Sequence, residues 1–523
     1  MSANELWRSG LVKVAPLGQN IGHSTPMFRT TKGTAMIMSQ EQALLKAHEQ
    51  FHQLLDSVRQ AADQAQRTDL VERDIMLRLL GIGLTVLTSF IARHGDGDSG
   101  PTVETPDGRT LRRLPEPHDR RYVSIFGEVL IPRVVYGTRE GQEIESVPLD
   151  RALGLPEGEF SYVLEDWVQR FCLKESFTEA SRSLETLLGL RLYSRTLEHM
   201  NQVVAGSATP FRETIGPPPA EEEGPLLVVT ADGKGVPMRR PEPDGPKPRP
   251  HHRRTPGEKA NKKQMACVGA VYSIKPFVRT ADDILDEVLR KKCAKGRPRP
   301  QHKHVWAEMT REIEGEEFKA KDLLFCQLHD ELALRQFGGE RPVICLMDGE
   351  RALWEAQRAY FSDAVGVLDL FHVMERLWAV AHCFHKDGSD EAKRFVEERL
   401  RGLLEGRVGY VIGGLRQRLT KGSLRGRKRE VVASAIEYLE NNREHMKYDE
   451  YLAAGYPIGS GVAEGACRHL VKDRLEQTGM RWTVTGAQAM LHVRSLYLND
   501  QWDEFVVYRI EEEQDRLYGR NAA

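Results

Sequence analysis

The sequence predicts a mixed α/β fold in its second half, because short apolar runs typical of buried strands alternate there with helical segments. Two of these runs lead into Asp-Gly, directly or after one Ala, and a third is followed at once by Asp. Alternation of this kind is typical of a sheet covered by helices. The expected strands are 226–230, 265–274, 343–347 and 365–368, and the expected helices are 352–361 and 371–384.

Length and composition narrow the class of protein. A chain of 523 residues is too long for one ordinary core, so two to four structural units are expected. The hydrophobic fraction of 40% and the charged fraction of 29% are typical of a soluble globular protein. The longest apolar-leaning segment, 81–92, is too short to span a bilayer, so we expect a buried helix and no membrane partner. The first residues show no signal pattern, which predicts a cytoplasmic location.

The first half of the chain predicts several regions in sequence. Residues 1–38 lack hydrophobic periodicity and are expected to be a disordered tail. Residues 39–95 carry apolar residues at spacings of three and four, which predicts amphipathic helices. Residues 118–146 contain β-branched and aromatic residues around a central Gly, which indicates a β-hairpin. Residues 206–224 are rich in Pro and Glu and are expected to be a linker.

Between the hairpin and the linker, residues 147–205 have the layout of a helix-turn-helix module. One helix is expected to end at Gly189, and the next to be capped by Ser194. The second helix of such a module can enter the major groove of DNA. An ordinary helical hairpin in a bundle would show the same pattern, so both interpretations remain open.

Residues 225–500 are expected to form one mixed α/β domain. A basic helical segment at about 385–455 is interpreted as an insertion into it, and 501–523 as a C-terminal tail. The seven cysteines are scattered singly, so neither structural zinc nor disulfides are expected.

Three acidic residues stand out by their positions. Asp232 and Asp348 follow apolar strands, and Glu464 lies just inside a helix that opens with Gly-Ser-Gly. Carboxylates at the ends of buried strands lie at the rim of a sheet, where oxygen ligands can converge on Mg²⁺. Two such ions can promote displacement at a phosphodiester. Taken singly, each acid fits a turn or a helix terminus equally well, and only the joint pattern favours a metal site.

Four segments of the second half stand out by their wording, namely TADGKGVP at 230–237, MDGERALW at 347–354, LDLFHVMERLW at 368–378 and YPIGSGVAEGACR at 456–468. They are followed by VKDR at 471–474, GMRWT at 479–483 and GAQAM at 486–490. Together these segments resemble bacterial insertion-sequence transposases of the ISKra type, and the similarity covers roughly 226–497.

The resemblance implies a ribonuclease-H-like domain with an Asp-Asp-Glu triad, carried over onto Asp232, Asp348 and Glu464. It implies that these residues hold Mg²⁺ or Mn²⁺, as two ions, and that the chain cleaves insertion-sequence ends and joins the 3′-hydroxyl to target DNA. The expected partners are the terminal inverted repeats, target DNA and further copies of the chain, as a homodimer or higher oligomer. The spacings are 348 − 232 = 116 and 464 − 348 = 116, and the wide second gap is consistent with the helical insertion.

The same resemblance suggests supporting residues. Asp369 and His372 match an Asp-x-x-His element that follows the second Asp in several transposase families of this fold. The alternative for this pair is a helix cap with a satisfied core histidine.

Several basic residues are candidates for contact with DNA phosphates. Arg468 and Lys472 lie four and eight residues after Glu464 and therefore on the same helical face. Trp482 could stack on an unpaired base, and core packing is its alternative role. A basic run at 239–263 is interpreted as a phosphate-contacting loop or as a solvated one. The candidates for DNA binding are Arg468, Lys472, Arg474, Arg481, Trp482, Arg253, Arg254, Lys262 and Lys263.

Two other functions remain as alternatives. One is a catalytically silent DNA-binding protein derived from a transposase, and the other is a structure-specific nuclease of the same fold.

Overall fold

The computed structural model describes residues 35–36, 39–105, 108–139, 144–239, 263–289, 296–336, 341–422 and 424–519. The expected tail at 1–38 lies outside the described residues, apart from 35–36. The chain divides into two compact units. Unit 1 contains Arg212–Gln501, and unit 2 contains the described residues up to Phe211 together with those from Trp502 onward.

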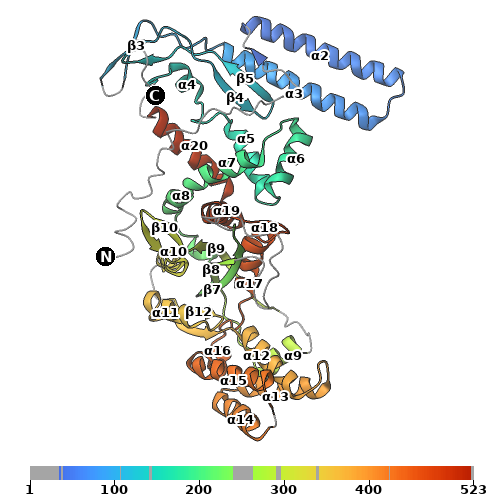
Figure 1. Cartoon of the computed structure of the whole chain (residues 1–523), viewed down its shortest axis with the longest axis vertical. Helices are drawn as coiled ribbons and strands as arrows, with labels where there is room; N and C mark the ends of the chain where they lie inside the picture. The colour runs from blue at the N-terminus through green and yellow to red at the C-terminus, as the bar shows by residue number, and fades with distance from the viewer. Residues whose placement is uncertain are drawn as a thin grey trace, which may run out of the picture. The chain divides into compact units, whose positions relative to one another are not determined.

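Unit 2 begins with a pair of long helices, α2 (Gln40–Asp63) and α3 (Thr68–Ala92), in the region where the sequence predicts helices. Ser39 and Gln42 form a capping box that starts α2, because each side chain accepts a hydrogen bond from the other residue's backbone N–H. Hydrogen bonds link Ser57 to Asp74 and Ser89 to the carbonyl of Gln40. The two helices therefore run antiparallel, side by side (Figure 1).

Helix α3 differs from the short buried helix that the sequence predicts at 81–92. It has 25 residues, and only 22% of its apolar window is buried. By length and composition alone it could cross a membrane, and no other helix among the described residues passes that test. The expectation of a buried helix is wrong because an apolar sequence does not reveal whether another element covers each face.

Two small sheets follow. β4 (Arg120–Ser124) and β5 (Gly127–Ile131) form an antiparallel hairpin around Gly127, where the sequence predicts one. β1 (Ala35–Met36) pairs with β5 in parallel. The second sheet has the order β2-β3-β6. Its strands are β2 (Thr102–Glu104), β3 (Thr110–Arg113) and β6 (Tyr136–Gly137).

Four helices occupy the region expected to be a helix-turn-helix module. Helix α6 has a Ser176 capping box and ends at Gly189, which adopts a left-handed φ of 67°. Helix α7 begins at Ser194, but its N-cap is Tyr193 and it has no side-chain cap. The expected Ser194 cap is therefore wrong by one position. The helices are α4 (Pro148–Leu153), α5 (Tyr162–Cys172), α6 (Phe177–Leu188) and α7 (Ser194–Gly206).

The two segments expected to be a linker and a tail both contain helices. Helix α8 (Ala208–Thr214) and a 3-10 turn (Ala220–Glu222) lie within 206–224. Helix α20 (Trp502–Tyr518) occupies most of 501–523 and packs within unit 2. Its Phe505 is fully buried, and its Arg509 donates to Glu165 at 2.8 Å. The tail interpretation is wrong because the partners of this helix lie more than 300 residues earlier in the chain.

Unit 1 is built on a five-stranded mixed sheet of order β13-β12-β7-β8-β9. β7, β8 and β9 are antiparallel neighbours, whereas β12 and β13 run parallel to β7. The sequence predicts all of these strands except β9. The strands are β7 (Leu226–Pro237), β8 (Lys263–Ile274), β9 (Gln301–Met309), β12 (Val343–Met347) and β13 (Val365–Leu368), with a separate hairpin of β10 (Arg311–Ile313) and β11 (Glu316–Phe318).

Helices complete unit 1. The expected insertion contains four helices between α12 and α17, and their apolar faces join the main core of the sheet. The insertion helices are α13 (Asp390–Leu404), α14 (Val408–Lys421), α15 (Arg427–Asn441) and α16 (Tyr448–Ala453). The other helices are α9 (Ala281–Leu289), α10 (Ala320–Arg335), α11 (Arg351–Tyr360), α12 (Leu370–Phe384), α17 (Gly461–Ala466), the π-helical segment η3 (Cys467–Lys472), α18 (Asp473–Leu475) and α19 (Val484–Leu498).

We expect α20 to be required for the stability of unit 2. Phe505→Ala should lower the free energy of unfolding by about 3 to 5 kcal/mol, because it leaves a cavity where a buried aromatic ring packed. Val507→Ala on the same helix is the matched control, since Val507 is 56% exposed. Urea denaturation measured by circular dichroism tests this, and equal midpoints for the two variants would show that α20 is only a tail.

Candidate active site

Three aspartates lie on adjacent strands at one edge of the unit 1 sheet. In the parallel register, Ala231 of β7 pairs with Met347 of β12, and Met347 pairs with Leu368 of β13. The residue that follows each of these three is an aspartate, which lies within β7 for Asp232 and directly after β12 and β13 for Asp348 and Asp369. Asp232, Asp348 and Asp369 are brought side by side by backbone pairing alone.

The position of Asp232 differs from the sequence prediction in one respect. It does not follow a strand, because β7 continues to Pro237 and Asp232 pairs with Val268 of β8. The long antiparallel pair of β7 and β8 extends beyond the end of β12 at Met347. Asp232 therefore lies at the first position where β7 has lost its neighbour on that side.

Asp232 is half-buried and has two hydrogen-bond partners. Its Oδ1 accepts from the backbone N–H of Gly233 at 2.6 Å, and its Oδ2 accepts from the Cys467 thiol at 3.4 Å. Burial and the negative charge of Asp232 raise the pKa of Cys467, so this thiol remains a proton donor. The contact joins η3 to the strand.

Asp348 is held by one hydrogen bond from a nearby residue and one from the helical insertion. Its Oδ1 accepts from the backbone N–H of Glu350 at 2.8 Å, and its carbonyl accepts from the hydroxyl of Tyr438 at 2.7 Å. Burial raises the pKa of Asp348, and the negative charge of Asp232 raises it further. The two carboxylates therefore lie close enough to repel each other.

Asp369 is fully buried and connects three elements. Its Oδ1 accepts from the N–H of Phe371 at the start of α12, and its Oδ2 bonds to His372 Nδ1 at 3.2 Å and to the Ser460 hydroxyl. The bond to Asp369 raises the pKa of His372 to about 9, and the charges of Asp348 and Asp232 also raise it. The imidazolium therefore faces the carboxylates at neutral pH.

Ser460 connects the start of α17 to Asp369. It occupies the N-cap position of α17, but its side chain makes no capping bond and donates to Asp369 instead. The buried carboxylate competes successfully for this hydroxyl, because a hydrogen bond to an ionised group is stronger than one to a backbone N–H.

Glu464 lies in the first turn of α17, and its side chain is exposed. Burial of part of the carboxyl raises its pKa, and the negative charge of Asp369 raises it further, whereas the positive charge of His372 lowers it. Glu464 is therefore within electrostatic range of Asp232, Asp369 and His372. The structure brings together all five residues that the sequence predicts as catalytic or site-supporting.

The carboxylates do not form a ready-made metal cage. Among the described residues, no group of three or more His, Cys, Asp or Glu side chains has the geometry of a metal site. The donor chemistry fits Mg²⁺ or Mn²⁺, because ionised carboxylates are the hard ligands that these ions prefer, and each has acceptor positions beyond those already used. Metal ligation by Asp232, Asp348 and Glu464 would therefore require their side chains to reorient.

Two residues predicted to bind DNA are buried instead. Arg474 is 0% exposed, and Trp482 is 5% exposed. The guanidinium of Arg474 lies over the Trp482 ring at 5.1 Å, and the indole N–H donates to the carbonyl of Leu475 at 3.0 Å. The expected contacts of these two side chains with DNA are corrected to core packing, because neither presents a surface to a ligand.

The remaining basic candidates have different surroundings. Arg468, Lys472 and Arg481 are exposed, and Arg468 lies 3.8 Å from Asp473. Lys263 forms an ion pair with Glu476. Arg253, Arg254 and Lys262 lie outside the described residues.

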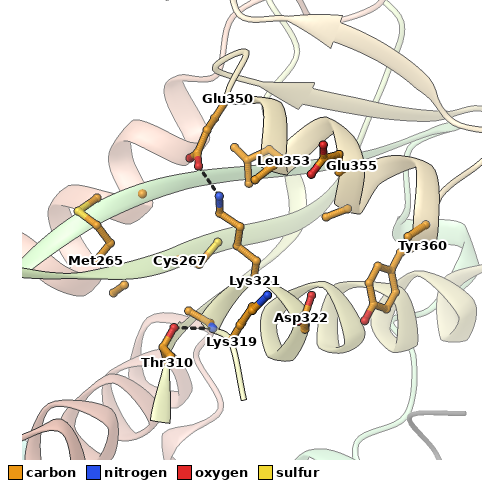
Figure 2. Close-up of a pocket in the computed structure, with 16 residues that line it drawn as sticks. Met265, Cys267, Thr310, Lys319, Lys321, Asp322, Glu350, Leu353, Glu355 and Tyr360 are labelled. Atoms are coloured by element: carbon orange, nitrogen blue, oxygen red, sulfur yellow. Dashed lines mark hydrogen bonds and ion pairs between the residues drawn. The ribbon is translucent and has the colours of Figure 1, made fainter. Parts of the chain in front are cut away.

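A cavity of about 630 Å³ lies where α10 and α11 cover the sheet (Figure 2). Gly233 and Cys267 are among the residues that line it, and Lys321 forms an ion pair with Glu350 there. Neighbouring strand residues face opposite sides of a sheet, so Gly233 opens to this cavity whereas Asp232 faces η3.

Sequence reasoning missed Tyr438, Tyr448 and Cys467 as parts of the site. The hydroxyl of Tyr448 donates to the carbonyl of Leu368, directly before Asp369, at 2.9 Å, and the hydroxyl of Tyr438 donates to the carbonyl of Asp348 itself. Both tyrosines belong to the insertion, and no local pattern links them to the strand ends. Cys467 lies within the resembling segment at 456–468, three residues after Glu464, and this position in the sequence could have marked it as a candidate.

Comparison with known proteins gives little support for any assignment. No family model matches the sequence, and no curated protein matches it. Among solved structures, the Drosophila P element transposase strand transfer complex is similar at 10% sequence identity, with a TM-score of 0.23, over 68% of this chain and 82% of that chain. At that TM-score the similarity supports no conclusion about function.

We expect the His372 imidazole to remain protonated well above neutral pH. Because its folded-state pKa of about 9 exceeds the usual value of 6.5, its contribution to stability is complete below pH 6.5 and is lost as the pH rises through 9. Histidine NMR of the protein in EDTA measures this, and Asp369→Asn should move the pKa down. An unshifted titration near 6.5 in the parent would contradict the contact.

Proposed function

We propose that this chain is a DNA transposase of the insertion-sequence type, a polynucleotidyl transferase dependent on Mg²⁺ or Mn²⁺. In this proposal it cleaves the ends of its element and joins the freed 3′-hydroxyl to target DNA. The observation that carries the proposal is the row of Asp232, Asp348 and Asp369 on adjacent strands, with Glu464 in electrostatic range.

The sheet supports a ribonuclease-H-like domain. Three antiparallel strands are followed by two strands parallel to the first, on its other side, and the acids lie where the first, fourth and fifth strands meet. The sheet order is consistent with the ISKra-type resemblance of the sequence segments, which surround the same strands and α17.

The electrostatics support a site for cations. The raised pKa values of Asp348 and Glu464 both include repulsion from neighbouring carboxylates, and a bound divalent cation would relieve it. Asp232, Asp348 and Glu464 would hold two such ions, which would supply activation of the attacking oxygen and stabilisation of the leaving oxygen. Asp369 and His372 do not need to be ligands, because their mutual bond and the bond from Ser460 position α12 and α17 against the strand ends.

Charge reversal along the helix supports DNA as the substrate. After the acidic Glu464, the exposed side chains of Arg468 and Lys472 follow on the same run of helix. Exposed cations that follow the acid along the chain in this way could hold the phosphates that flank the scissile bond.

Neutral isosteric substitutions in the triad should separate chemistry from binding. Asp232→Asn, Asp348→Asn and Glu464→Gln each remove a charge that the cations need, and each should abolish cleavage and strand transfer. Cleavage of DNA carrying the element's own ends should be measured with Mg²⁺, Mn²⁺ and EDTA, beside a gel-shift of the same DNA. Gel-shift affinity in EDTA should remain close to that of the parent.

The matched control is Glu398→Gln, because Glu398 is an exposed acid on α13 whose only described ion pair is with its neighbour Arg399 at 3.3 Å. It should cleave at the parent's rate. Full activity in any triad variant would remove that residue from the triad. DNA binding without cleavage in the parent would indicate a silent DNA-binding protein, and cleavage without joining would indicate a structure-specific nuclease.

Arg468 and Lys472 should contribute affinity that does not depend on sequence. The double variant Arg468→Ala/Lys472→Ala should weaken binding of all duplexes and reduce the slope of log affinity against log salt by about 2, since each phosphate contact contributes about 1. Lys393→Ala, an exposed lysine on α13, is the control. A slope equal to the parent's would show that these two side chains are only solvated.

A further inference from the structure

The pair formed by α2 and α3 carries an apolar face that no described residue of unit 2 covers. Seven large side chains make up this face, and each is between 38% and 55% exposed. We call it the hairpin face. Its members are Leu44, Phe51 and Leu55 of α2 and Met76, Leu79, Val86 and Phe90 of α3.

On α2, the hairpin face lies next to the seam that contacts α3. The seam consists mainly of small residues, with Ala43, Ala47 and Ala61 buried beside Leu54. The exposed stripe follows one position later along the helix, at Leu44, Phe51 and Leu55. Because one residue advances about 100° around a helix, this stripe faces sideways from the seam.

Helix α3 has three distinct faces. One meets α2, as the bonds of Asp74 and Ser89 show. The opposite face packs on the β4–β5 hairpin through Ile91, with Leu84 and Leu87 against the same cluster. The exposed stripe lies between these two faces, and its members recur at spacings of three, seven and four residues, which keeps them in one line.

The two stripes lie on the same side of the hairpin. On each helix, the stripe lies about 100° around the helix axis from the side that contacts the other helix. The direction of this rotation is the same on both helices when each is followed from its first residue to its last. Because α2 and α3 run in opposite directions, equal rotations bring both stripes to one side. The result is one continuous surface made by two helices.

The size of this surface is comparable with part of a stable interface between proteins. The face runs from Leu44 to Leu55 on α2 and from Met76 to Phe90 on α3, which is about 17 and 21 Å of helix. Two adjacent helices are roughly 20 Å wide together, so the face measures about 400 Å². A standard interface buries about 800 Å² on each partner, so the face supplies about half of one.

Charge disfavours lipid and nucleic acid as the occupant. The two helices carry seven acidic side chains (Glu41, Glu49, Asp56, Asp63, Asp69, Glu72 and Asp74) and four basic ones (Lys46, Arg59, Arg73 and Arg78). An excess of acid repels anionic headgroups and phosphates. Insertion of α3 across a bilayer would also bring the charged residues of α2 into the hydrocarbon, because α2 packs along its length.

We propose that the hairpin face binds the same face of a second copy of this chain, so that two α2–α3 pairs form a four-helix bundle. A self-complementary apolar surface is what a twofold interface requires. The bundle forms without DNA and without metal, so this inference stands independently of the proposed activity.

The mass of the full chain in solution tests the proposal. Light scattering after size exclusion at micromolar concentration, in EDTA and without DNA, should give twice the chain mass of 59.3 kDa. Phe51→Glu/Leu79→Glu places a charge on each helix at the centre of the face, and should give the mass of one chain with at least a hundredfold weaker association. Circular dichroism should show the helix content unchanged, because both side chains are about half exposed in a single chain.

The matched control is Val278→Glu/Tyr410→Glu, which alters exposed apolar side chains of unit 1, 69% and 78% accessible. This variant should remain dimeric. A monomeric parent, or a dimer that survives Phe51→Glu/Leu79→Glu, overturns the proposal. A parent that becomes dimeric only when residues 1–38 are removed also overturns it, because the face would then bind that segment. Flotation of the parent with phosphatidylcholine vesicles that is lost in Phe51→Glu/Leu79→Glu would assign the face to lipid.

Discussion

Backbone pairing between β7, β12 and β13 is the constraint on which the candidate site depends. Parallel strands in register place equivalent residues in a row, and here the row after Ala231, Met347 and Leu368 is three aspartates. Hydrogen bonds of the ladder, rather than contacts between the carboxylates, hold these mutually repelling groups together. The apolar strand residues before them are fully or almost fully buried, so the energy that maintains the cluster comes from the core.

Other elements offset the accumulation of negative charge. His372 supplies a cation through its bond to Asp369, and Ser460 and Cys467 supply hydrogen-bond donors from the α17 and η3 segments. Tyr438 and Tyr448 bind the backbone carbonyls at the two strand ends. The helical insertion is therefore part of the site's support, since its buried apolar residues belong to the same core as the sheet.

The two units show different balances between burial and exposure. In unit 1 even a tryptophan and an arginine beside the candidate site are buried against each other. In unit 2 the α2–α3 pair leaves half of several large apolar side chains in solvent. An apolar face of this size is costly in a single chain, which is why its extent points to association.

The sequence by itself determined the elements whose signals are local. Short apolar runs predicted four of the five strands of the main sheet, and apolar spacings of three and four predicted the helices at 39–95. The resembling segments selected the five residues that the structure brings together. Tertiary structure decided what depends on distant partners: the in-strand place of Asp232, β9, the packing of α20 and the role of Tyr438. It also decided that Arg474 and Trp482 are buried and that α3 is not. The local sequence gives the polarity of each side chain. The residues that cover that side chain lie tens to hundreds of positions away, so only the folded chain determines whether it is buried.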